Sequence, residues 1–119
     1  MGGNCIFCDI VAKEVKADIL AENEWFVAFP DAHPISEGHT LIVPKRHAES
    51  FFDIEEDDLR FLGPFVKEVA TLLKNKFHAD GVNVVNANGK AAQQSVFHFH
   101  VHVVPRFEDD GLDLWFHGQ

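Results

Sequence analysis

Apolar residues and histidines alternate strictly over Phe97–Val103, within the predicted strand Val96–Val104. Successive side chains of an extended strand point to opposite faces of its sheet, so this alternation predicts a strand. Phenylalanine and valine side chains would then occupy one face and enter the core. Three histidines share the other face of the predicted strand: His98, His100 and His102.

Shorter apolar runs, bounded by residues that favour turns, predict four more strands. They cover Ile19–Glu22, Trp25–Phe29, His39–Val43 and Val82–Val85. The near-helical spacing of apolar residues within Cys5–Val15 predicts a short N-terminal helix of one to three turns. Because strands dominate and helices do not separate each pair, the pattern favours an α+β fold with an antiparallel five-stranded sheet.

One long helix is predicted over Ile54–Phe77, with Asp53 as its N-cap and acidic residues in its first turn. Its apolar positions form one stripe: Leu59, Leu62, Val66, Val69, Leu72 and Leu73. Pro64 lies inside this segment and removes a backbone hydrogen bond, so we expect a kink or a division into two helices there.

Composition narrows the class of protein. The chain has 119 residues, 46% of them hydrophobic, and no linker or repeat, which indicates one domain over residues 1–119. A formal net charge of −9 argues against non-specific binding to the phosphate backbone of nucleic acids. No apolar run approaches a membrane span, and the first residues do not resemble a signal peptide. Two cysteines without such a signal suggest a reducing compartment, so we expect a cytoplasmic protein.

The histidine row allows three interpretations. A solvent-facing row of histidines is unusual, because exposed strand faces normally carry Lys, Glu or Thr. A three-histidine zinc site conflicts with strand geometry, since His98 and His102 would stand about 13 Å apart along the backbone. At most one end of the row can therefore hold a metal. In the third interpretation the middle histidine, His100, is a nucleophile, because neutral imidazole is nucleophilic near neutral pH.

The row and several other segments resemble the histidine triad (HIT) family. Its signature is a glutamine followed by histidines at alternate positions, as in Gln94–Val104. The likeness extends to four further segments: Cys5–Ile10, Ala28–Asp31, Gly38–His47 and Asn88–Gly89. The resemblance implies a single HIT-like domain that forms homodimers through a continuous sheet. It also implies an enzyme that binds purine nucleotides.

The resemblance implies a role for each matching residue. His100 would attack phosphorus and form a nucleotidyl-histidine intermediate, while the His98 carbonyl would hold the His100 ring in its tautomer. His102 would contact the phosphate, and Ser95 and Gln94 would bind the leaving-group side. The remaining nucleotide contacts would come from the ribose carboxylate Asp31, from Asn88, and from an apolar base slot of Ile6, Phe7, Ile10 and Phe29.

Cys5 and Cys8 form a Cys-x-x-Cys pair, which can supply half of a tetrahedral zinc site. A redox pair usually follows a strand, and none precedes these cysteines; two unrelated thiols are the other alternative. Family members with this pair resemble a structural zinc site completed by two histidines, which here would be His47 and His98.

The leading hypothesis is a hydrolase or nucleotidyl transferase acting on phosphoramidates, acyl adenylates or dinucleoside polyphosphates. One alternative is a nucleotide-binding regulatory module without turnover, and another is a zinc-handling protein. Four features depart from the family pattern: Gln93, Ala87, His33 and the C-terminal segment after Leu112. They bear on rate and on the choice of leaving group rather than on the reaction class.

Overall fold

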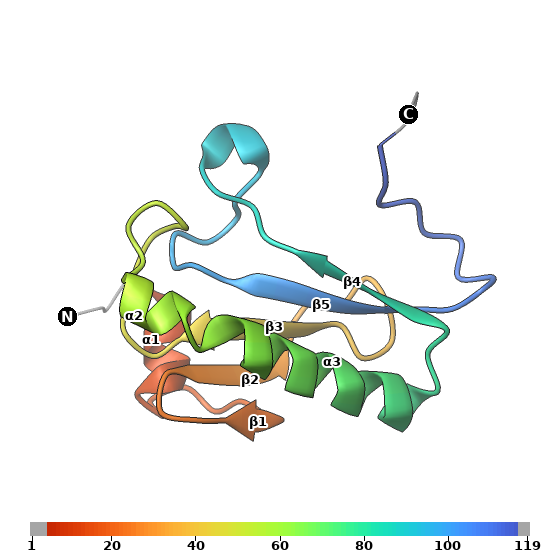
Figure 1. The fold of residues 1–119 in the computed structure, drawn as a ribbon, viewed down its shortest axis with the longest axis horizontal. Helices are drawn as coiled ribbons and strands as arrows, with labels where there is room; N and C mark the ends of the chain where they lie inside the picture. Colours follow the sequence, from red (N-terminus) through yellow and green to blue (C-terminus); the bar gives the residue numbers. More distant parts are fainter. Residues whose placement is uncertain (1–4, 117–119) are drawn as a thin grey trace.

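A computed structural model describes residues 5–116 of the chain (Figure 1). Residues 1–4, on which the expectation about a signal peptide depends, and residues 117–119 at the C-terminus lie outside the described range. Five strands form one antiparallel sheet in the order β1-β2-β3-β5-β4. Their bounds are β1 Ala21–Glu22, β2 Phe26–Pro30, β3 Thr40–Pro44, β4 Gly81–Val85 and β5 Val101–Arg106. The predicted α+β class is therefore correct.

Each face of the sheet packs against a different helix. Helix α3, Leu62–Phe77, lies along one face and buries Phe65, Val69 and Leu73 (Figure 1). The short helix α1, Ile6–Val11, packs Phe7 and Ile10 among residues of β2 and β3. The apolar residues of α1 therefore lie on the face of the sheet opposite α3. The short helix covers only part of this face, so the remainder is accessible for a site.

The long predicted helix is divided into α2, Glu56–Leu59, and α3. The break comes at Arg60 and Phe61, where the Phe61 ring stacks on Trp25 with 3.6 Å between centroids. Pro64 then falls in the first turn of α3, where a backbone N–H has no helical partner to lose. The expected division is present, but it precedes the proline.

Two details of this helix prediction are wrong. Asp53 does not cap α2, because its carboxylate accepts the N–H groups of Glu49 and Ser50 instead. The N-cap position of α2 belongs to Glu55. Leu72 is 43% exposed, so it does not belong to the buried stripe, which runs through residues four apart.

The histidine strand is shorter than predicted. Strand β5 begins at Val101, whereas residues 96–100 approach β3 without forming a ladder. The physical reason is Pro44 at the end of β3, which has no N–H to donate. The alternation holds from Phe99 onward, because Phe99, Val101 and Val103 are buried in the core beside α3. Phe97 precedes the strand and is 48% exposed, so its predicted place in the core is wrong. Among residues 5–116, no helix has the length and apolar content needed to cross a membrane.

Candidate functional site

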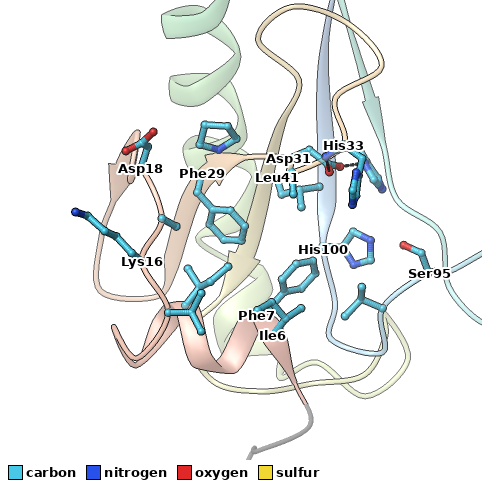
Figure 2. Close-up of a pocket in the computed structure, with 17 residues that line it drawn as sticks. Ile6, Phe7, Lys16, Asp18, Phe29, Asp31, His33, Leu41, Ser95 and His100 are labelled. Carbon is cyan, nitrogen blue, oxygen red and sulfur yellow. Dashed lines mark hydrogen bonds and ion pairs between the residues drawn. The ribbon is translucent and has the colours of Figure 1, made fainter.

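The three histidines of the row lie on the sheet face that carries α1. His98 and His100 are almost completely buried, at 0% and 3% exposure, and His102 is half-buried. His102 pairs with Leu41 of β3, and its ring centroid lies 5.0 Å from that of His100. Figure 2 shows the His100 ring between Phe7 and Ser95. The row therefore lines the floor of a site rather than a solvent-exposed face.

Backbone carbonyls set which nitrogen of each ring carries the proton. Nδ1 of His100 lies 2.8 Å from the His98 carbonyl oxygen, and Nε2 of His98 lies 2.9 Å from that of Pro44. Because a carbonyl only accepts, we assign a proton to each of these nitrogens. His100 therefore presents an unprotonated Nε2, and His98 presents an unprotonated Nδ1 toward the cysteines.

A cavity of about 620 Å³ opens beside His100 (Figure 2). The predicted base-slot residues Ile6, Phe7, Ile10 and Phe29 all line it, together with Leu41 and Val96. Phe7 and Phe29 meet edge to face at 5.8 Å between ring centroids, and the Phe7 ring also lies 5.2 Å from the His100 ring. Such an apolar slot can hold a flat aromatic group with its attached phosphate near the histidines.

Asp31 stands where this cavity meets a second one of about 430 Å³. One carboxylate oxygen accepts the His33 N–H at 2.9 Å, and the other lies 3.4 Å from Nε2 of His39. A carboxylate has about four lone-pair positions, and one accepts the His33 N–H, so at least two remain available to a ligand. The two cavities share four of their lining residues: Asp31, His33, Ser95 and His102.

Cys5, Cys8, His47 and His98 form a compact cluster of four metal-ligating side chains. The sulfur and Nδ1 atoms are 3.2–3.8 Å apart, and the two nitrogens are 3.1 Å apart. A tetrahedral zinc ion with ordinary bond lengths separates its ligand atoms by about 3.3–3.8 Å. The His98 contact with Pro44 also supplies the outer hydrogen bond typical of zinc-bound imidazole.

The electrostatics of the cluster match a cation site. Burial and the neighbouring Cys5 raise the pKa of the Cys8 thiol to about 11. Burial is the main cause that lowers the pKa of His98 to about 4, which keeps this imidazole neutral. Neutral imidazoles and thiols, whose thiolate form a bound cation would stabilise, make a donor set that fits zinc.

Two predicted nucleotide contacts lie outside both cavity linings. The Gln94 amide accepts the Gly89 N–H at 2.8 Å and donates to the Val96 carbonyl at 2.9 Å. Asn88 accepts the Phe51 N–H at 2.6 Å. Both side chains hydrogen-bond to backbone groups and so stabilise the loop that precedes the histidine row. Their contact with a nucleotide stays a prediction.

Gln93, one of the departures from the family pattern, has a φ of 71°. This left-handed conformation is unfavourable for a residue with a Cβ and free for glycine. The glycine usual at this position would therefore relieve backbone strain.

The sequence analysis did not identify His39 and Asn86 as site residues. Nε2 of His39 lies 3.0 Å from Nδ1 of His102, and the Asn86 amide donates to the His100 carbonyl at 2.8 Å. His39 precedes β3, and its proximity to His102 depends on the pairing of β3 with β5. That pairing is long-range, so no local pattern could have revealed it.

Comparisons of the sequence and of the structure with known proteins all find members of one family. The family model described as the HIT domain matches residues 12–109. An uncharacterised HIT-like protein of Methanocaldococcus jannaschii is 45% identical over 107 residues, covering 90% of this chain and 82% of that protein. The adenosine 5'-monophosphoramidase of Saccharomyces cerevisiae is 40% identical over 109 residues, covering 91% and 66% respectively. A zinc-bound histidine triad family protein from Mycobacterium smegmatis superposes with a TM-score of 0.89 at 34% identity, covering 100% and 86%.

Proposed function

Because the chain belongs to the HIT family, we propose that it hydrolyses purine nucleotide conjugates through a nucleotidyl intermediate on His100. The yeast relative named as an adenosine 5'-monophosphoramidase makes phosphoramidates the first substrates to test. One observation carries the proposal. The buried His100 ring donates its Nδ1–H to the His98 carbonyl and leaves Nε2 unprotonated, at the end of an apolar slot and near a carboxylate.

In the first step Nε2 of His100 attacks the α-phosphorus. A phosphorus–nitrogen bond forms, and the bond to the leaving group breaks. The leaving nitrogen or oxygen takes up one proton from solvent as it departs, and the water molecule of the second step returns one. The imidazole becomes positively charged, and the retained Nδ1–H then donates more strongly to the His98 carbonyl, since charge-assisted hydrogen bonds are stronger.

In the second step a water molecule attacks the same phosphorus. The bond to His100 breaks, the water gives up one proton, and the neutral imidazole and a nucleoside monophosphate are released. His102 and Ser95 are among the residues that line both cavities, and we assign them to the phosphoryl group between nucleoside and leaving group. We assign the ribose hydroxyls to two unoccupied lone-pair positions of Asp31.

We also propose one structural zinc ion per chain, held by Cys5, Cys8, His47 and His98. The proposal rests on the tetrahedral spacing of the four ligand atoms and on the zinc-bound neighbour. When bound, zinc would fix the start of α1, because Cys5 is the N-cap of that helix. It would also fix His98, whose carbonyl orients His100.

A homodimer joined at β4 is the third element of the proposal. Within the described residues, β4 is an end strand of the sheet, and its Val84 and Val85 side chains are 53% and 42% exposed. An uncovered apolar edge strand can pair with another chain. Antiparallel pairing of two β4 strands would join the sheets of two chains.

The experiment that tests the activity is a turnover screen of adenosine phosphoramidates, aminoacyl adenylates and dinucleoside polyphosphates. We expect release of AMP from at least one class, and loss of that release in His100→Ala with nucleotide affinity nearly unchanged. This split arises because a nucleophile acts mainly in the transition state. Gln93 and Ala87 depart from the family pattern and leave open the alternative of a nucleotide-binding module without turnover. Tight AMP binding with no turnover by the parent protein would support that alternative.

A further inference from the structure

His39 is a buried histidine, 4% exposed, that lines the second cavity but not the base slot. Both of its ring nitrogens have partners: Nδ1 faces the Ile35 N–H at 3.2 Å, and Nε2 faces Nδ1 of His102 at 3.0 Å. We propose that His39 is a positioning residue that holds His102 in the tautomer with its proton on Nε2. The consequence for turnover rests on the proposed function, whereas the tautomer itself does not.

The assignment begins at a backbone group whose direction is certain. The Ile35 amide can only donate, so Nδ1 of His39 must accept and carries no proton. A neutral imidazole has one proton, which therefore resides on Nε2 of His39. Burial lowers the pKa of His39, which agrees with this neutral state.

The same logic extends one ring further. Nε2–H of His39 points at Nδ1 of His102, so this nitrogen accepts and the His102 proton resides on Nε2. Burial is the main cause that lowers the pKa of His102 to about 4, so this ring is also neutral near pH 7. His102 consequently offers an N–H donor on the ring nitrogen that His39 does not occupy. Its neighbour His100 offers a lone pair instead.

Two adjacent histidines therefore perform opposite tasks because different backbone groups orient them. A carbonyl at residue 98 gives His100 an unprotonated Nε2, suited to attack. An amide at residue 35, acting through His39, gives His102 a protonated Nε2, suited to donate a hydrogen bond to a phosphoryl oxygen. The opposite His102 tautomer would direct a lone pair at that negatively charged oxygen.

A metal ion is the rival explanation, since Asp31, His39 and His102 lie close enough to ligate one. A metal on Nε2 of His39 would require the ring proton on Nδ1. That N–H would then face the Ile35 N–H at 3.2 Å, and neither donor would have an acceptor. The hydrogen-bond partners therefore favour a proton between the two rings over a cation.

The same His39 proton also lies near the carboxylate assigned to the ribose. Oδ2 of Asp31 is 3.4 Å from Nε2 of His39, slightly farther than Nδ1 of His102 at 3.0 Å. His102 itself is 4.0 Å from the carboxylate, which is too long for a direct hydrogen bond. The shorter distance therefore assigns the His39 proton to His102, with the carboxylate nearby and not hydrogen-bonded to His102.

Imidazole nitrogen NMR on ¹⁵N-labelled, ligand-free protein at neutral pH tests the tautomer without any substrate. We expect Nδ1 of His102 at the shift of an unprotonated nitrogen and Nε2 at that of a protonated one. His39→Gln keeps an N–H donor near the position of Nε2 and should preserve this pattern. His39→Leu has similar bulk but no donor and should give mixed tautomers. A parent His102 protonated on Nδ1 would overturn the proposal even if neither variant folded.

Turnover of an adenosine phosphoramidate provides the second readout. We expect kcat to fall about tenfold or more in His39→Leu, the effect of losing roughly one net hydrogen bond at the transition state, and to recover in His39→Gln. Equal kcat in the parent and His39→Leu would also refute the positioning role. A parent protein without turnover would refute the proposed function instead, and the NMR result would still decide the role of His39.

Discussion

Asp31 offers a quantitative test of nucleotide recognition. Its carboxylate already accepts the His33 N–H and faces His39, which leaves two lone-pair positions for the two ribose hydroxyls. A hydrogen bond to a charged group contributes about 1.5–3 kcal/mol. Asp31→Asn keeps an oxygen for the His33 N–H but loses the negative charge. We therefore expect AMP to bind about 10- to 150-fold more weakly, at about 1.4 kcal/mol for each factor of ten.

Isothermal titration with two ligands separates ribose recognition from a general loss of structure. AMP and 2',3'-dideoxy-AMP should differ in affinity for the parent protein and differ much less for Asp31→Asn. Thermal unfolding of the variant serves as the control for folding. If removing both hydroxyls costs the same affinity in the parent and in Asp31→Asn, the carboxylate does not bind the ribose and the reasoning fails.

Three further predictions concern zinc, acid stability and assembly. Elemental analysis of metal-replete protein should find one zinc per chain. Cys8→Ser should lose this zinc and have a lower Tm, since structural zinc contributes folding free energy. A metal-free parent protein would contradict this prediction. His102 should contribute a fall of about 2–3 kcal/mol in the free energy of unfolding as pH drops from 6.5 to about 4, because the unfolded chain binds a proton at this histidine that the buried ring resists. Urea titrations should show a smaller drop in His102→Gln, and an equal drop would contradict the cause. Light scattering should find a dimer that Val84→Lys on β4 dissociates. Val15→Lys, which lies in the segment between α1 and β1, should leave the dimer intact, and a monomeric parent would exclude this assembly.

Local patterns predicted the parts of the fold that depend on side-chain periodicity. The alternation around the three histidines correctly placed Phe99, Val101 and Val103 in the core, whereas Phe97 is 48% exposed. It could not reveal that Pro44, far away in the sequence, would end the pairing and let β5 begin only at Val101. Asp53 has the composition of an N-cap, but its carboxylate is already occupied by the preceding turn. Propensity was overridden there by a competing local hydrogen bond.

In the candidate site too, local motifs predicted some residues, whereas long-range contacts determined others. The Cys-x-x-Cys spacing and the histidine row contained enough information to predict the four clustered ligands, given the family resemblance. His39 had no comparable signal, because an isolated histidine at the start of a predicted strand is most simply explained as a core or strand-end residue. Its position beside His102 arises from strand register, which is a property of the whole sheet. Residues that act through another residue are therefore harder to predict than residues that belong to a motif.

The intermediate on His100 is the central claim, and rapid quench followed by peptide mass spectrometry tests it most directly. Protein mixed with an adenosine phosphoramidate and quenched in base within the first turnover should carry one added adenylyl group. The adduct should be labile in acid, as expected for a phosphorus–nitrogen bond, and should map to His100. His100→Ala should show neither the adduct nor turnover. An adduct on another residue, or turnover that persists in His100→Ala, would contradict the account.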